Sequence, residues 1–144
     1  MPVKNKITRV VIDTNIWVSF LISDKYRKLD TLLLGNRIKI LFSTELLEEL
    51  NKVSIYPKLK KYFPPNAVEE MITNLGAYIE LIKVITKTDV CRDSNDNFLL
   101  SLAKDGKAKY LITGDADLLI LKVFGKTKII TLTDYFKLTQ KNFR

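Results

Sequence analysis

Short apolar runs alternate with helical patterns along most of this chain, and this alternation limits the possible fold more than any other feature. The runs are rich in Val, Ile and Phe, as buried strands are, and they cover residues 9–12, 38–42, 83–86, 109–113 and 127–131. Helical patterns cover residues 14–23, 26–34, 44–53, 66–82 and 97–104, with a short closing helix at 134–139. Strands that alternate with helices are typical of a parallel sheet covered on both faces. We therefore expect an α/β fold: a three-layer sandwich with a mostly parallel five-stranded sheet between helices.

The length of 144 residues fits one domain spanning 1–144, and no stretch has the composition of a linker. The apolar run at 16–22 is too short for a membrane span and lacks the pattern of a signal peptide. The single cysteine, Cys91, excludes an internal disulfide and a cysteine-rich zinc site, and we expect it to be a small buried hydrophobe. The expected location is the cytoplasm, without a membrane partner.

Histidine is absent from the chain, which excludes Ser-His-Asp and Cys-His catalysis and the common imidazole zinc sites. The full phosphate-binding pattern G-x-x-x-x-G-K-[ST] is absent, and so is the dinucleotide-binding pattern G-x-G-x-x-G. The 24 Lys and Arg residues against 16 Asp and Glu residues give a formal charge of +8. This balance favours a polyanionic partner such as RNA, with an ordinary basic soluble protein as the alternative.

Acidic residues follow two of the expected strands. Asp13 stands where the first strand ends and a helix begins, and Asp115 follows the strand at 109–113. Ligands of parallel α/β sheets bind outside the carboxyl ends of the strands, so both carboxylates are candidates for a functional site. The alternative is that each aspartate only caps the helix after it.

Further acids lie on the helices that are expected to border the same edge. On the helix at 44–53, Glu49 lies at the edge of the apolar face and Glu48 points almost directly away from it. Asp96 falls over the inward side of the next helix, one turn after Asp93, and either aspartate could be a helix cap.

Asp13, Glu49, Asp96 and Asp115, with Asp117 in support, come from four segments that this topology would bring together. Clustered carboxylates repel one another unless a cation lies among them, and oxygen-only ligands favour Mg²⁺ or Mn²⁺. Magnesium in a carboxylate cleft of a basic protein indicates phosphodiester hydrolysis.

The pattern resembles the PIN-domain nucleases. The matching segments are Asp13-Thr14-Asn15, Ser43 followed by Glu49, Asp93-x-x-Asp96 before Phe98, and Thr113-Gly114-Asp115-x-Asp117-Leu118-Leu119. The last of these segments resembles the toxin branch of prokaryotic toxin-antitoxin systems, the VapC-like ribonucleases. Two residues depart from the family pattern: Trp17 is bulky and close to the expected cleft, and Asn97 stands where some relatives have another acid.

This resemblance implies a Mg²⁺-dependent endoribonuclease with Asp13, Glu49, Asp96 and Asp115 as its acidic quartet and Asp117 as an auxiliary ligand. Thr14, Asn15 and Thr113 would be polar supports that orient carboxylates or water, and Asp93 lies beside them in the motif. Family membership would also imply a protein antitoxin and a homodimer.

Three other protein classes share part of this pattern. A receiver-like signalling domain has the same kind of sheet, but Asp13 lacks an acidic neighbour of the sort it needs. An aspartyl-nucleophile phosphatase needs a second aspartate where Asn15 stands. A catalytically inactive RNA-binding PIN domain is the third alternative, and the intact quartet speaks against it.

Two surfaces are candidates for partners. The apolar stripe of the helix at 66–82 would pack on the core or serve as a dimer or antitoxin groove. The lysines Lys58, Lys60 and Lys61 with Tyr56 and Tyr62 could hold single-stranded nucleic acid, or could be solvated surface with buried rings.

Overall fold

The computed structural model describes residues 7–23 and 38–142, with side chains of the last helix described through Leu138. Its strands form one six-stranded sheet in the order β3-β2-β1-β4-β6-β5. The strands are β1 (Thr8–Ile12), β2 (Ile38–Phe42), β3 (Ile79–Leu81), β4 (Tyr110–Ile112), β5 (Val123–Phe124) and β6 (Thr127–Ile130). All neighbouring pairs are parallel except β5 with β6. The expected α/β fold with a mostly parallel sheet is confirmed, with β5 added by a tight antiparallel turn.

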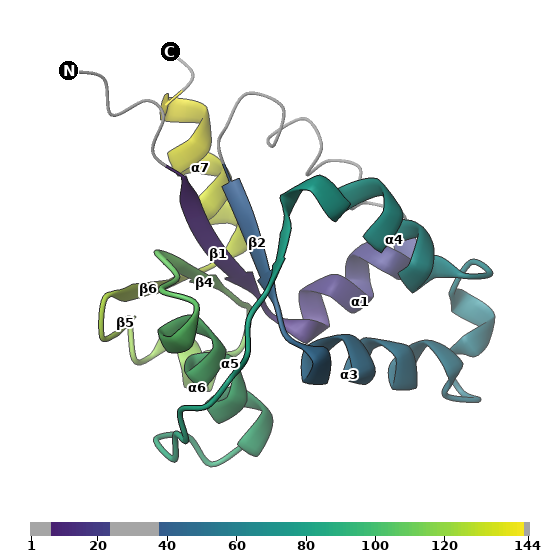
Figure 1. Ribbon diagram of the computed structural model, residues 1–144, viewed down its shortest axis with the longest axis horizontal. Coiled ribbons are helices and arrows are strands. Elements are labelled where there is room, and N and C mark those ends of the chain that lie inside the picture. Colours follow the sequence, from purple (N-terminus) through teal and green to yellow (C-terminus); the bar gives the residue numbers. More distant parts are fainter. Residues whose placement is uncertain (1–6, 24–37, 143–144) are drawn as a thin grey trace.

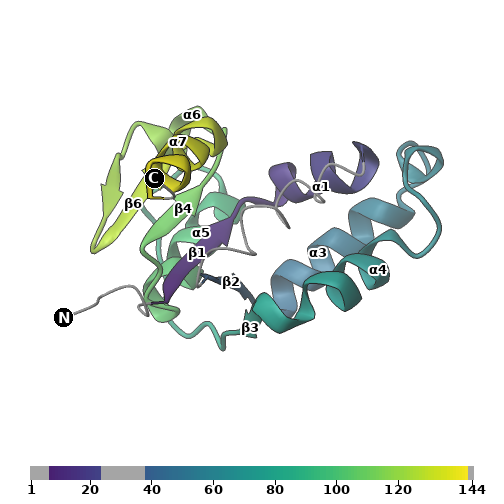
Figure 2. The same ribbon diagram turned by 90° about the horizontal axis from the view of Figure 1, so that it is seen from above.

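The helices cover this sheet on both faces. They are α1 (Thr14–Ser23), α3 (Thr44–Ile55), α4 (Ala67–Leu75), α5 (Ser94–Asp105), α6 (Ala116–Leu119) and α7 (Leu132–Asn142), with short 3-10 turns at Lys60–Tyr62 and Gly76–Tyr78. α5 packs on β1, β2 and β4, whereas α7 reaches β4 through Tyr135, whose ring lies 6.0 Å from that of Tyr110. Figures 1 and 2 show α5 and α7 on opposite sides of β1 and β4, with α1, α3 and α4 grouped together beyond the ends of β1 and β2.

The core is made by the central strands and the inner faces of these helices. Val10, Val11, Leu41 and Leu111 are fully buried, as expected of central parallel strands. Trp17 is also fully buried and packs on Phe20 and Phe42, at ring distances of 6.1 and 5.2 Å. The expectation that Trp17 stands beside a cleft is therefore wrong, because its ring fills the core under α1.

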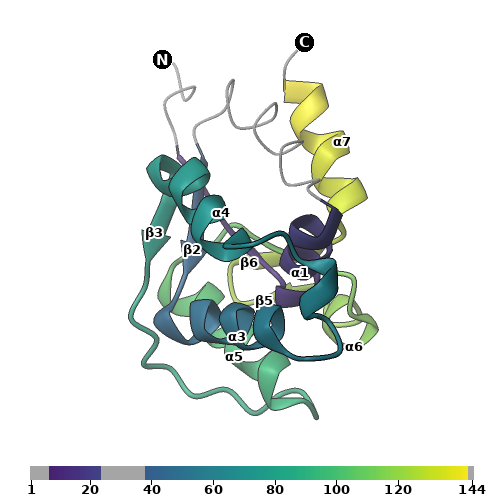
Figure 3. The ribbon, with the colours of Figure 1, turned by 90° about the vertical axis from the view of Figure 1, so that its right-hand side faces the viewer.

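The expected helix at 66–82 and strand at 83–86 differ from the structure. α4 ends at Leu75, a 3-10 turn follows, and Ile79–Leu81 pairs with β2 as the edge strand β3, visible at the left of Figure 3. Residues 83–86 make no ladder, because the amides of Ile85 and Thr86 donate to the carboxylate of Asp105 on α5. The expected helix at 26–34 lies outside the described residues.

The bounds of two other helices also differ from those expected from the sequence. α5 begins at Ser94 rather than Asn97, because Asp93 caps it by accepting from the amide of Asn95. α7 is longer than the expected 134–139.

No helix in the described part of the chain is long and apolar enough to cross a bilayer.

Arg9 ties the opening strand to two other elements. Its guanidinium donates to both oxygens of Glu80 on β3, at 2.9 and 2.8 Å, and to the carbonyl of Gly106 at the end of α5, at 2.7 Å. Bidentate pairs of this kind fix geometry as well as adding energy. The pair also raises the pKa of Arg9 and lowers that of Glu80, chiefly through these hydrogen bonds.

The close approach at Gly106 gives a test of this packing. A β-carbon at Gly106 would lie 2.6 Å from Leu41 Cδ1 and 3.0 Å from the carbonyl oxygen of Leu102. Gly106→Ala should therefore lower the free energy of unfolding by roughly 1–3 kcal/mol, the usual cost of overpacking. Urea unfolding would measure the change.

Gly76→Ala is the matched control. Gly76 has φ −54° and nothing within 4 Å of its added carbon. This substitution should leave stability unchanged or raise it by about 0.4–1 kcal/mol, because alanine restricts the unfolded chain. Equal losses for the two alanine variants would contradict the packing described for Gly106.

Candidate metal centre

The parallel pairing of β1 with β4 places the candidate site. Ile12 lies opposite Ile112, and the amide of Asp13 donates to the carbonyl of Ile112 at 2.9 Å. The next side chains meet directly, since the hydroxyl of Thr113 donates to Asp13 Oδ2 at 2.6 Å. The carboxyl ends of these two strands therefore bring residues 13 and 113 together across 100 positions of sequence.

Asp13 and Asp115 are helix caps as well as candidate site residues. Asp13 Oδ1 accepts from the amide of Asn15 at the start of α1, and Asp115 Oδ1 accepts from the amide of Asp117 at the start of α6. The Thr113 hydroxyl also accepts from the amide of Asp115 at 3.0 Å. The two interpretations offered by the sequence, cap and site residue, are thus compatible in one carboxylate.

A cleft of about 490 Å³ opens at this edge of the sheet. It is bordered by seven carboxylates and a single lysine, Lys52. The acids come from the end of β1, from α3, from the start of α5 and from the end of β4: Asp13, Glu45, Glu48, Glu49, Asp93, Asp96 and Asp115. Thr14 and Asn15 line the same cleft, so the four segments named from the sequence meet there.

The three glutamates of α3 all face this cleft. Glu49 is half-buried, and Glu45 and Glu48 are exposed on the same wall. Glu48 points away from the buried apolar face of α3, as expected, but it still borders the cleft beside Glu45 and Glu49. Ser43 begins this helix, with its hydroxyl accepting from the amide of Leu46 at 3.0 Å.

The tightest acidic group lies at the junction of α5 and α6. Carboxylate oxygens of Asp96, Asp115 and Asp117 all lie within 4.8 Å of one another. Asp13 and Glu49 border the cleft but are not members of this trio. Asp117, expected to be auxiliary, lies in the trio and also pairs with the exposed guanidinium of Arg92 at 3.0 Å.

Asp96 is the buried member of the trio. Asp96 is 5% exposed, and its Oδ2 atom has no hydrogen-bond partner. Burial, and then the charges of Asp115, Asp93 and Asp13, raise the pKa of Asp96 to about 6. Burial and the same acidic surroundings also raise the pKa of the Cys91 thiol. A buried carboxylate oxygen without a donor, facing other carboxylates, is the arrangement that a cation would satisfy.

Asn97 has a structural role beside this trio. Its amide group donates to the carbonyl of Cys91 at 2.8 Å and accepts from the amide of Cys91 at 2.7 Å. This pair of hydrogen bonds fixes the segment before α5, which carries Arg92 and Asp93. In the sequence Asn97 stands out only as a position where some relatives have an acid, because no local pattern reveals the partner of an amide side chain.

The chain matches the PIN domain family over residues 9–117, which include every acid of the cleft. It therefore belongs to the PIN domain family, whose members are generally nucleases. The chain is also 34% identical, over 117 residues, to an uncharacterized protein, MJ1680, of Methanocaldococcus jannaschii; the match covers 79% of this chain and 75% of the relative. The family confirms the expected PIN domain, whereas the toxin branch, the antitoxin and the homodimer stay predictions.

The raised pKa of Asp96 has a consequence for stability. The folded protein holds this proton more tightly than the unfolded chain, so the free energy of unfolding without metal should fall as pH rises from 3.8 to about 6. Asp96→Asn cannot ionise and should be more stable than the wild type at neutral pH. At about 1.4 kcal/mol per pKa unit, the expected gain is on the order of 1–3 kcal/mol.

Urea unfolding in EDTA across this pH range would measure the effect. Asp89→Asn is the matched control, because Asp89 is exposed and does not border the cleft. It should follow the wild type at every pH. If Asp96→Asn instead lost stability at neutral pH, the ionised carboxylate of Asp96 would not be the destabilising group inferred from its burial and its acidic neighbours.

Proposed function

We propose that this protein is an endoribonuclease that depends on Mg²⁺ or Mn²⁺. The observation that supports this most is Asp96 Oδ2, buried without a partner beside the carboxylates of Asp115 and Asp117. Mg²⁺ binds oxygens at about 2.1 Å, so two ligands on opposite sides of one ion lie roughly 4 Å apart. The spacing of the trio is therefore close to that of a hard-cation site, and its donors are all carboxylate oxygens.

In this proposal Asp96, Asp115 and Asp117 hold the cation, and Asp13 and Glu49 complete the acidic cleft. A bound divalent cation activates water and stabilises the leaving oxygen in phosphodiester hydrolysis. Thr113 fixes the carboxylate of Asp13 through its hydroxyl, and the same hydroxyl positions the backbone of Asp115. Asn15 is exposed and lines the cleft, where its amide side chain would orient water or substrate.

Substitution of the acids separates this chemistry from folding. Asp96→Asn and Asp115→Asn should each lower RNA cleavage at least roughly a hundredfold, taking the loss seen for supporting residues as a floor for metal ligands. The Asp115→Asn variant should still fold, because asparagine keeps the side-chain oxygen that caps α6. A Mn²⁺-dependent rise in melting temperature, present in the wild type, should be lost in both variants.

Asp89→Asn again serves as control and should retain both activity and the response to Mn²⁺. Cleavage that persists in EDTA would overturn the proposed dependence on metal. Folded wild-type protein that binds Mn²⁺ and RNA without cutting would instead identify the inactive RNA-binding alternative.

RNA needs positive charge that the cleft itself lacks. The seven carboxylates and Lys52 give the cleft a formal charge of −6, and two divalent cations would leave −2. Substrate affinity must therefore come from basic residues elsewhere, consistent with the charge of +8 on the whole chain.

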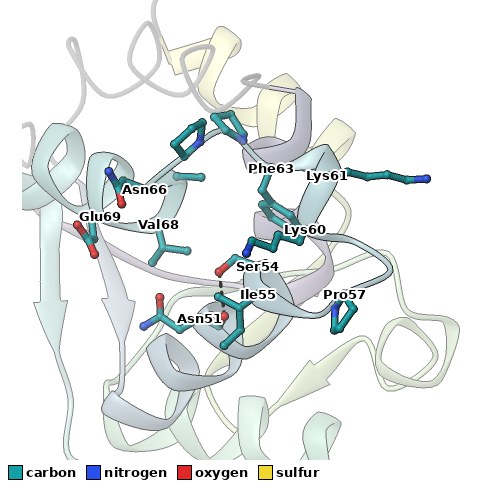
Figure 4. A pocket seen from close by; sticks show the side chains of 13 residues that line it. Asn51, Ser54, Ile55, Pro57, Lys60, Lys61, Phe63, Asn66, Val68 and Glu69 are labelled. Carbon is teal, nitrogen blue, oxygen red and sulfur yellow. Dashed lines mark hydrogen bonds between the residues drawn. The ribbon is translucent and has the colours of Figure 1, made fainter.

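One basic hollow adjoins α3. It encloses about 670 Å³ between the end of α3 and the start of α4, and Figure 4 shows Lys60, Ile55 and Phe63 around it with Lys61 extending outward. The nearby residues Tyr56 and Tyr62 are 49% and 53% exposed, so the expectation of buried rings does not hold. Exposed rings beside lysines are suited to stacking with bases of a single strand.

Charge reversal would test this path. Binding of single-stranded RNA, measured with Ca²⁺ in place of Mg²⁺, should show a log-log salt slope that is shallower in a Lys58→Glu, Lys60→Glu, Lys61→Glu variant. Each lost phosphate contact contributes about 0.7, so the slope should change by up to about 2. An unchanged slope would assign these lysines to solvated surface.

A further inference from the structure

A second basic groove lies at the amino ends of the parallel strands, whereas the acidic cleft lies at their carboxyl ends. It encloses about 780 Å³ and is formed where β1 and β4 begin and where β5 turns into β6. At about 3.3 Å per residue, the five residues of β1 separate it from Asp13 by roughly 17 Å. The groove is therefore distinct from the candidate metal centre.

Four lysines surround this groove, and none of its lining residues is acidic. Lys104 ends α5, Lys107 and Lys109 lie on the connection to β4, and Lys126 lies in the turn between β5 and β6. All four are exposed, and no described carboxylate forms a salt bridge with them. Arg9 also borders the groove, but Glu80 already balances its charge.

The floor of the groove is apolar and its frame is fixed. Ala103 and Ala108 are buried beneath it, and Phe124 lies half-buried at its side. The amide of Lys109 donates to the carbonyl of Arg9 at 2.7 Å, and the hydroxyl of Thr127 donates to the carbonyl of Ala108 at 2.7 Å. The lysine-bearing segments are thus held together before any ligand binds, which lowers the cost of ordering a site.

Helix electrostatics account for only part of this cluster. A lysine in the last turn of α5 is favoured by the negative end of the helix dipole, which explains Lys104. This effect falls off within a turn, and it does not explain Lys126, which comes from the far side of the groove. The lysines come from separate segments around an apolar floor, and none is in a described salt bridge. Lys109 also lies over the ring of Tyr110, with its ammonium 5.5 Å from the ring centre. Such a groove is complementary to a chain of phosphates whose bases have flat, apolar faces.

We propose that this groove, lined by Lys104, Lys107, Lys109 and Lys126, binds single-stranded RNA as a second site remote from the acidic cleft. The proposal rests on the proposed ribonuclease function for its choice of polyanion. The lysines would neutralise phosphates while bases lie against Phe124 and the alanine floor. The affinity for RNA should therefore depend on its length. An RNA long enough to reach both the groove and the cleft binds more tightly than one that fills only the cleft.

The test is RNA binding in EDTA, where cleavage plays no part. The probe is a fluorescein-labelled oligouridylate of about 16 nucleotides, the upper end of single-strand site sizes. A Lys107→Gln, Lys126→Gln variant should bind about tenfold more weakly, with a salt slope shallower by about 1.4 for two lost phosphate contacts. The control is Lys83→Gln, Lys87→Gln, which removes the same charge from exposed positions outside the groove and should change neither quantity.

Circular dichroism would establish that both double variants are folded. Equal dissociation constants and slopes for the two variants, or absence of wild-type binding in EDTA, would overturn the proposal. With Mn²⁺ present, the groove variant should cut a substrate of about four nucleotides like the wild type and lose efficiency only on the long one. If the wild type cuts neither substrate, the ribonuclease proposal fails while binding in EDTA still decides the role of the groove.

Discussion

The parallel pairing of β1 with β4 is the constraint on which the site depends. The pairing continues past the last strand residues, through the hydrogen bond from the amide of Asp13 to the carbonyl of Ile112. The side-chain bond from Thr113 to Asp13 then locks the two strand ends together. Because side chains alternate along a strand, a shift of one residue would turn Asp13 away from Thr113 and dismantle the cleft.

The acids are held together despite their repulsion by backbone hydrogen bonds. Asp13, Asp93 and Asp115 each accept from an amide at the start of a helix, so their orientation is fixed before any cation binds. Asp96 lies in the first turn of α5 without such a bond to its buried oxygen. Burial of this carboxylate, followed by the charges of Asp115, Asp93 and Asp13, raises the pKa of Asp96 to about 6.

Much of this arrangement could be predicted from the sequence, and the misses have physical reasons. The strands at 38–42 and 127–131 were recognisable from their buried apolar runs, and the match to the PIN domain family confirms the family suggested by the acidic motifs. β3 was missed because an edge strand of three residues directly follows a helix and continues its apolar spacing. The run at 83–86 looks like a strand, but its amides bond to Asp105, a partner that no local pattern reveals.

The functional residues also divide into those that the sequence reveals and those that depend on tertiary packing. The strand-end aspartates could be found because topology alone places them. The position of Glu48 at the cleft and the pairing of Arg92 with Asp117 depend instead on how α3 and the segment before α5 are packed. The net charge of the whole chain indicates the kind of partner but not where on the protein that partner binds. It indicated a polyanionic partner, while the separation of an acidic cleft from a basic groove emerges only in three dimensions.

The central claim is that the trio of aspartates forms a divalent cation site. Its most direct test is a crystal structure of the wild-type protein grown with Mn²⁺, with anomalous scattering recorded at the manganese edge. The account predicts an anomalous peak coordinated by Asp96 Oδ2 together with carboxylate oxygens of Asp115 and Asp117. An empty trio at saturating Mn²⁺, or manganese bound only elsewhere on the protein, would contradict it.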